Sequence, residues 1–246
     1  MSAAINPKRK GIISIDFWFT MVDGRVGGEV RNRIRLEALN KIAQSNNAEL
    51  QKNLVKEAYA FASAEFEKIW LQEQRTMSTK DLVGLVLQKL GLKATDMQLE
   101  TLSKVYAESL WDGPPALAPG LQEAIPKLAE HYDLGIISDT MYSPGTVLRV
   151  FLEKNGLLKY FKAFVFSDEV GYSKPDKRAF ESIREQLQSS SEETAYHIGD
   201  LVKTDIKGAN QSGYQSVQYT GLNFDGHTKD AKHVLENWKD SETLFD

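Results

Sequence analysis

The chain has 246 residues, of which 41% are hydrophobic and 26% charged, and these proportions indicate an ordinary globular protein with enough residues for a sizeable core. A formal net charge of −4 argues against a broad basic surface, so we expect no nucleic-acid partner. The absence of cysteine excludes a disulfide framework, a thiol nucleophile and zinc held by thiolates.

The first ten residues are basic, and a short apolar run at residues 11–15 follows them. That run is too short for the core of a signal peptide or for a membrane span, but its length suits a buried strand. We therefore expect no membrane partner and take the cytoplasm as the default location. Nothing in the sequence indicates the oligomeric state.

A long segment after residue 22 contains no strand-like run and shows helical periodicity instead. Apolar residues recur at intervals of three to four in the stretches 54–69, 82–90 and 99–110. Helix-start and helix-stop signals accompany these stretches: Ser78 with Asp81, Thr95 with Gln98, and Gly91. Proline and glycine between residues 112 and 120 indicate a hinge. The pattern predicts an all-helical insertion over residues 23–114.

Strands and helices alternate after the hinge. Further apolar runs at residues 134–138, 163–167, 195–199 and 216–219 predict strands, and the pairs Ser143-Pro144 and Asn155-Gly156 bound one intervening helix. Runs of this kind suit strands buried on both faces of a parallel sheet. The expected fold is α/β, a doubly wound, mainly parallel Rossmann-like sheet made by residues 1–22 and 115–246 and interrupted by the helical insertion.

Polar residues follow several of these strands at the point where each strand ends. In open α/β sheets, ligands bind beyond the carboxyl ends of the strands, so these side chains should share one crevice, with a lysine reaching it from a loop. The residues are Asp16, Thr20, Ser138, Asp139, Lys174, Asp200 and Asp205. This arrangement predicts an enzyme site.

At these residues the chain resembles the haloacid dehalogenase superfamily of hydrolases, most of which are phosphatases. The four motifs of that family occur here in the family's order: Asp16-Phe17-Trp18-Phe19-Thr20, Ile137-Ser138-Asp139, Tyr172-Ser173-Lys174-Pro175, and Gly199-Asp200 with Asp205. The resemblance implies that the insertion is a helical cap of the C1 type, which closes over the site and selects a small phosphorylated metabolite.

The resemblance also implies a role for each residue. Asp16 is the expected nucleophile, which forms an aspartyl-phosphate. Thr20, Ser138, Asp139 and Lys174 are expected to meet the substrate, the lysine by offsetting the charge between carboxylate and phosphate. A Mg²⁺ cofactor would be held by Asp16, Asp200 and the main-chain carbonyl of Trp18, while Asp205 contacts metal-bound water or orients Lys174.

Trp18 departs from the phosphatase pattern, because the family places there an Asp that protonates the leaving group and later activates water. A group of this kind typically contributes about 10²–10⁴ in rate, and an indole cannot replace it. Three hypotheses stay open. The protein is a slow phosphatase or one that borrows an acid such as Asp139; it binds a phosphorylated ligand with weak catalysis; or it is a 2-haloacid dehalogenase, which has Tyr at this position and uses no metal. The Asp200 and Asp205 motif favours the first two.

Several other residues carry a weaker expectation. Asp23 would enter the site only if the chain curls back after the first motif, and His197 is expected to be a hydrogen-bonded core histidine. We expect a solvated helix end rather than an anion site at Arg31, Arg33 and Arg35. Trp70 and Trp111 are expected to pack inside the helical insertion.

Overall fold

Six parallel strands form the central sheet of the computed structural model, which describes residues 9–222, 226 and 228–245. The strand order is β5-β4-β1-β6-β7-β8. The strands are β1 (Gly11–Ile15), β4 (Tyr132–Ser138), β5 (Phe161–Phe166), β6 (Ala195–Gly199), β7 (Gln215–Tyr219) and β8 (His233–Leu235). The predicted doubly wound α/β fold is confirmed, and β8 is an addition, since a three-residue strand leaves no pattern in the sequence.

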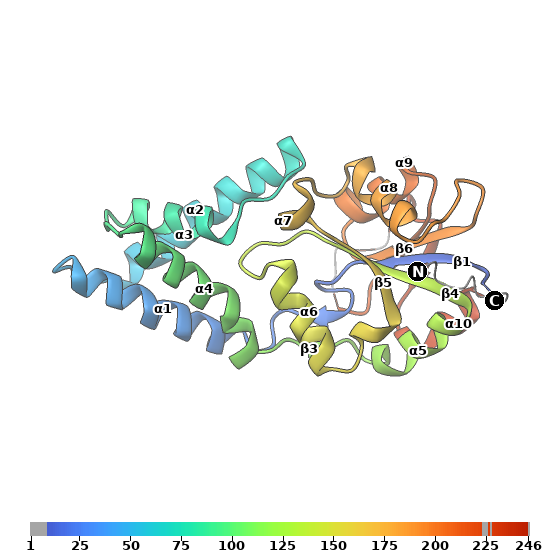
Figure 1. The fold of residues 1–246 in the computed structure, drawn as a ribbon, viewed down its shortest axis with the longest axis horizontal. Coiled ribbons are helices and arrows are strands. Elements are labelled where there is room, and N and C mark those ends of the chain that lie inside the picture. The colour runs from blue at the N-terminus through green and yellow to red at the C-terminus, as the bar shows by residue number, and fades with distance from the viewer. Residues whose placement is uncertain (1–8, 223–225, 227, 246) are drawn as a thin grey trace.

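Alternate side chains of β1 pack on the two faces of the sheet. Ile13 and Ile15 belong to one buried apolar cluster and Ile12 to another, because successive side chains of a strand point to opposite faces. In Figure 1, α5 (Leu121–His131), α6 (Gly145–Lys154) and α10 (Ser241–Phe245) lie on one side of the sheet, and α8 (Lys177–Gln186) and α9 (Lys207–Gln211) on the other. The remaining short helices are α7 (Ser167–Val170), η1 (Leu158–Tyr160), η2 (Val202–Ile206) and η3 (Trp238–Asp240).

Four helices form a bundle beside the sheet, seen on the left of Figure 1. They are α1 (Gly28–Ser45), α2 (Lys52–Glu73), α3 (Thr79–Lys89) and α4 (Asp96–Asp112). The last three confirm the periodic stretches of the sequence, and α3 and α4 begin with the capping boxes of Ser78 with Asp81 and Thr95 with Gln98. The bundle buries its own apolar cluster, in which Leu39 and Tyr106 are fully buried.

A two-stranded antiparallel ribbon lies where the chain enters and leaves the bundle. It pairs β2 (Val22–Asp23) with β3 (Ala116–Leu117), close to the predicted limits of the insertion at residues 23 and 114. The division of the chain into a core and a cap stays a prediction, which we take up below. No helix in the described ranges combines the length and the hydrophobicity needed to cross a bilayer.

Candidate active site

Three neighbouring strands bring the predicted acids and the serine to one edge of the sheet. Asp16 follows β1, which lies between β4 and β6, while Ser138 ends β4 and Asp200 follows β6. The backbone N–H of Asp16 donates to the carbonyl of Ile198 at 2.8 Å, so the pairing of β1 with β6 holds the backbone of Asp16 in place. All three side chains are buried.

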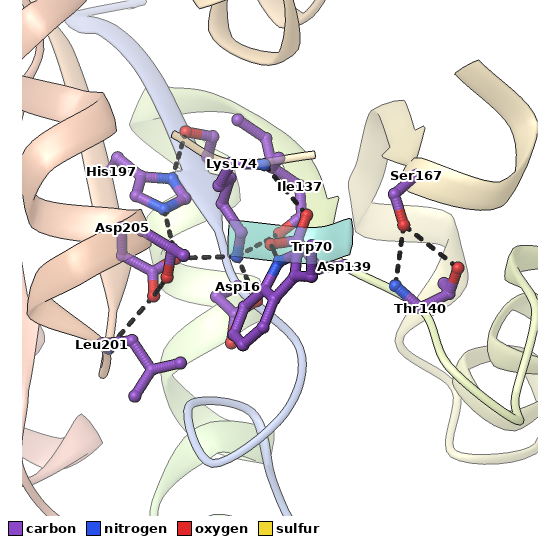
Figure 2. A network of polar contacts seen from close by, with 12 residues as sticks. Asp16, Trp70, Ile137, Asp139, Thr140, Ser167, Lys174, His197, Leu201 and Asp205 are labelled. Carbon is purple, nitrogen blue, oxygen red and sulfur yellow. Dashed lines mark hydrogen bonds and ion pairs between the residues drawn. The ribbon is translucent and has the colours of Figure 1, made fainter. Parts of the chain in front are cut away.

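Lys174 joins this edge from the loop between α7 and α8. Its Nζ donates to the carboxylate of Asp16, to Oδ1 of Asp205 at 2.7 Å and to the carbonyl of Ile137 at 3.1 Å (Figure 2). These partners use all three donors of the ammonium group. Burial by itself lowers the pKa of Lys174, but the carboxylates of Asp16 and Asp205 outweigh it and raise that pKa. The lysine is therefore charged and fixed beside the proposed nucleophile.

Asp205 is held by four donors of the protein. Its Oδ1 accepts from Lys174 and from Nε2 of His197 at 3.0 Å, and its Oδ2 accepts from the backbone of Leu201 at 3.0 Å and from the hydroxyl of Thr204 at 3.3 Å. Burial raises the pKa of Asp205, yet Lys174 and the histidine outweigh it and leave that pKa below its usual range. Asp205 is thus an anion that orients the lysine.

His197 supports Asp205 from the strand behind it. Burial lowers the pKa of His197, and an ionised carboxylate only accepts, so Nε2 donates to Asp205 while Nδ1 accepts from the hydroxyl of Ser14 at 2.8 Å. The expected core histidine is confirmed, with both ring nitrogens bonded. The sequence did not indicate that it positions the Asp205 carboxylate.

Gly199 is required by the same carboxylate. A Cβ at Gly199 would lie 2.3 Å from Cγ of Asp205, a distance at which one of the two must move. The glycine of the fourth motif therefore makes room for the side chain that holds Lys174.

Two hydroxyls at this edge have no partner within the part of the chain that the structure describes. Oγ1 of Thr20 and Oγ of Ser138 are both buried and unbonded. A buried polar atom without a partner costs about 1–3 kcal/mol, so a ligand that offers an acceptor would satisfy both groups favourably. Neither residue lines the two cavities described below, so the expectation that they bind phosphoryl oxygens stays a prediction.

The carboxylates leave this edge with an excess of negative charge. Asp16, Asp200 and Asp205 each offer an oxygen, and the three oxygens lie within 4.8 Å of one another. Burial raises the pKa of Asp16 well above its ordinary value. The charge of Lys174 opposes this rise, and the charges of Asp205 and Asp200 add to it. Mg²⁺ prefers such oxygen ligands, and since both oxygens of Asp205 are already engaged, Asp16 and Asp200 suit it best.

A cavity of about 350 Å³, which we call the catalytic cavity, opens in front of these groups. Trp18 lines it and packs edge-on against Phe17 at 5.2 Å, so the position that lacks an acid is filled by an indole. Trp70 of α2 lines it too, and its Nε1 donates to Oδ2 of Asp139 at 2.9 Å (Figure 2). The expectation that Trp70 packs away inside the bundle is therefore wrong, because α2 carries it to the edge of the sheet.

Asp139 faces the same cavity after the end of β4. Its Oδ1 accepts from the backbone N–H of Lys174 at 3.0 Å and its Oδ2 from Trp70. Burial raises its pKa to about 6, and the charge of Lys174 and the Trp70 bond keep it from rising further. Asp139 is therefore a carboxyl group that changes its protonation near neutral pH.

A second pocket of about 290 Å³, which we call the arginine pocket, adjoins the catalytic cavity and shares four lining residues with it: Trp18, Trp70, Asp139 and Met141. Arg31 and Arg35 of α1 line it and are buried, so the expectation of a solvated helix end is wrong for both. Packing of α1 against α4 covers them, whereas Arg33 points to solvent and pairs with Glu37 at 3.1 Å.

Two residues considered from the sequence lie away from both cavities. Asp23 pairs with Arg25 at 2.8 Å, and that bond lowers the pKa of Asp23. The expectation that Trp111 packs inside the helical insertion is wrong: it packs against the apolar cluster of the sheet, with the ammonium of Lys154 over its ring at 5.5 Å, because it lies near the end of α4 that returns to the sheet.

Comparison with known proteins assigns the chain to the family that its motifs resemble. The model of the family described as haloacid dehalogenase-like hydrolase matches residues 46–219, a range that contains Ser138, Lys174, Asp200 and Asp205 but begins after Asp16. Pyrimidine 5'-nucleotidase PynA of Streptococcus pneumoniae is 32% identical over 78 residues, which are 32% of this chain and 33% of PynA, so the chain covers about a third of that relative.

Solved structures share the fold at low identity. The putative HAD-hydrolase YfnB of Bacillus subtilis, in a crystal form bound to magnesium, matches with a TM-score of 0.66 and 20% identity over 97% of this chain and 100% of YfnB. A 2-haloacid dehalogenase of Pseudomonas syringae pv. Tomato DC3000 matches with a TM-score of 0.71 and 17% identity over 95% of this chain and 97% of that protein.

Proposed function

The chain belongs to the haloacid dehalogenase-like hydrolases, and we propose that it hydrolyses small phosphate monoesters through an aspartyl-phosphate on Asp16. The observation that carries the proposal is the cluster of Asp16, Asp200 and Asp205 around the buried ammonium of Lys174. A halide leaves without a proton or a metal, so the dehalogenase hypothesis gives no role to Asp200, whereas a metal-dependent phosphatase would use it as a metal ligand. A phosphoryl group, in contrast, needs positive charge around its oxygens.

The reaction would start with attack by the free oxygen of Asp16 on phosphorus. Lys174 contacts Oδ1, which leaves Oδ2 as the attacking atom. The P–O bond to the alcohol breaks as the bond to Oδ2 forms, and Thr20 and Ser138 donate hydrogen bonds to the phosphoryl oxygens. Water then attacks the aspartyl-phosphate, which releases inorganic phosphate and restores the carboxylate of Asp16.

Asp139 is the group that we propose to move the proton. Trp18 cannot supply one, and the other acids of the cavity serve as nucleophile, metal ligand or partner of the lysine. A pKa of about 6 leaves part of Asp139 protonated at neutral pH, so it would protonate the departing alkoxide and then take a proton from the attacking water. The backbone N–H of Lys174 and Trp70 hold it in place.

Asp16, Asp200 and the main-chain carbonyl of Trp18 would hold a Mg²⁺ ion, which supplies positive charge opposite the phosphoryl oxygens. The helices α1 to α4, over residues 23–114, would act as the cap, and residues 1–22 and 115–246 as the core. Trp70 and the two buried arginines support this division, because they carry bundle side chains to cavities that the sheet also lines. The cap would then choose the substrate.

A panel of phosphate monoesters, assayed with Mg²⁺ and with a chelator beside a panel of 2-haloacids, tests the proposal. We expect phosphate release that depends on Mg²⁺ and is abolished in Asp16→Asn, whose circular dichroism and melting temperature should match the wild type. Halide release that is insensitive to the chelator would establish the dehalogenase instead. Tight binding of phosphorylated ligands with no turnover over the whole panel would establish a binding protein.

A further inference from the structure

Arg35 is a buried cation in the arginine pocket with no carboxylate partner among the residues that the structure describes. Its Nε donates to Oγ of Ser109 at 3.0 Å and to the carbonyl of Tyr106 at 3.3 Å, and its Nη2 donates to the same carbonyl at 3.3 Å. The guanidinium also lies 4.8 Å from the ring centroid of Tyr142. Burial lowers the pKa of Arg35 and outweighs the opposing effect of the nearby tyrosines Tyr59, Tyr142 and Tyr106.

The guanidinium of Arg35 has donors that its protein partners do not use. Arginine has five N–H donors, and Nη1 takes part in none of the bonds given above. Nη1 is not fully enclosed by protein, and Arg35 is one of the residues that line the pocket. The hydroxyl of Tyr142, which lines the same pocket, is buried without a hydrogen-bond partner in the described part of the chain.

Arg31 adds a second positive charge one helical turn before Arg35. It donates to the carbonyls of Val26, Gly24 and Gly113, all neutral acceptors where the chain enters and leaves the bundle. Burial and then the charge of Arg35 lower the pKa of Arg31. Two like charges four residues apart destabilise a helix, and burial increases that cost. An anion in the pocket would offset both effects.

The two cavities share part of their lining, and each has at least one cationic side chain that could receive an anionic group. The catalytic cavity would receive a phosphoryl group beside Lys174. The arginine pocket, which also has Trp18 and Trp70 in its lining, holds two arginines against the single carboxyl group of Asp139. We propose that the substrate carries a second anionic group, a carboxylate or a phosphate remote from the reacting phosphoryl group, which Arg35 binds with the support of Arg31. The inference rests on the proposed hydrolysis at Asp16 and names the class of substrate: phosphate monoesters with a distal anion.

The first test compares matched substrates with the wild-type protein. A series of phosphate monoesters that end in a carboxylate, with increasing numbers of methylene groups, is assayed beside the corresponding neutral amides and beside bisphosphates of similar length. We expect kcat/KM to favour one anionic length over its amide by at least about 30-fold, the effect of leaving a buried charge unpaired. Preference for the carboxylate or the bisphosphate identifies the source of the anion. Equal rates on acids and amides, or the highest kcat/KM on nucleoside monophosphates with no distal anion, would overturn the inference.

The second test assigns the preference to Arg35. Arg35→Met keeps the length of the side chain and leaves the Tyr106 carbonyl bonded to the hydroxyl of Ser109 at 2.7 Å, so it should fold. We expect it to lose the preference for the anion, so that kcat/KM becomes similar for each acid and its amide. Arg33→Met, the matched exposed control on the same helix, should keep the preference. A preference that persists in Arg35→Met would refute the role of Arg35. If that variant does not fold, Arg35→Lys replaces it. The lysine lacks the planar fork of donors with which an arginine binds a carboxylate or phosphate, so it should lose most of the preference.

Binding of phosphonocarboxylates separates this inference from the proposed function. A C–P bond is not hydrolysed by attack of a carboxylate, so calorimetry reports binding whether or not the protein is an enzyme. Binding that is at least about 30-fold tighter than that of the amide and is lost in Arg35→Met supports the anion site even if no phosphate monoester is cleaved. Turnover of phosphate monoesters without this difference leaves hydrolysis standing and refutes the anion site.

Discussion

Replacing Asp139 with Asn should separate alkyl from aryl phosphates as substrates. The alkoxide of an alkyl phosphate needs a proton as it departs, whereas a phenolate leaves without one. Asn has nearly the shape of Asp but cannot transfer a proton. Of the two hydrogen bonds that Asp139 accepts, from Lys174 and Trp70, the amide oxygen retains one, and the donor left without a partner should cost about 1–3 kcal/mol.

The size of the effect follows from the general acid and from its pKa. Loss of the acid should lower kcat on alkyl phosphates by about 10²–10⁴, and on aryl phosphates by less than about tenfold. With a pKa of about 6, Asp139 is about half protonated at pH 6 and about one-tenth protonated at pH 7. The wild-type rate on alkyl phosphates should therefore fall about tenfold for each pH unit above 7, and the variant should lack this fall.

The assay is a pH profile of kcat on an alkyl and an aryl phosphate for the wild type and Asp139→Asn. Trp18→Asp in the Asp139→Asn background should restore part of the alkyl activity, because it returns an acid to the position where the family carries one. The proposal for Asp139 is wrong if the variant keeps both the alkyl rate and the decline at high pH. It is also wrong if alkyl and aryl phosphates lose activity equally.

Three further changes test other contacts. Trp70→Phe removes the N–H that stabilises the Asp139 anion, so the pKa of Asp139 should rise. The fall of kcat on alkyl phosphates at high pH should therefore begin at a higher pH. In Gly199→Ala the new Cβ, 2.3 Å from Cγ of Asp205, should displace that carboxylate, lower stability by about 1–3 kcal/mol and remove most of the activity. Asp200→Asn should weaken Mg²⁺ binding in calorimetry by at least about tenfold, with an unchanged melting temperature.

Each of these variants has a control or a contrary outcome. Gly84→Ala is matched to Gly199→Ala, because a Cβ at Gly84 in α3 meets no atom within 4 Å, and it should be neutral or stabilising by up to about 1 kcal/mol. An active, stable Gly199→Ala would show that the carboxylate of Asp205 need not stay where it is. Unchanged Mg²⁺ affinity in Asp200→Asn would remove that residue from the metal site, and an unshifted pH profile in Trp70→Phe would remove the indole from the control of Asp139.

The sequence by itself determined five of the six strands of the central sheet, the two helices with capping boxes, and the edge of the sheet at which Asp16, Ser138 and Asp200 meet. These features are local in their physics. A buried strand needs a short apolar run, and a capping box needs Ser78 and Asp81 three residues apart. The position of Asp16, Ser138 and Asp200 follows from the rule that parallel strands end at a common edge.

Only the tertiary structure decided which polar residues outside the motifs reach the site. Trp70 and Asp139 are 69 residues apart in the sequence, and Arg35 and Tyr106 are 71 apart, so no periodicity connects them. An arginine on a helix resembles a solvent-facing residue until the surface that covers it is known, and here the packing of α1 against α4 buries Arg35 while Arg33, two residues before it, stays exposed. Burial is a property of the packed neighbours rather than of the side chain, and it is burial that leaves the charge of Arg35 in need of an anion.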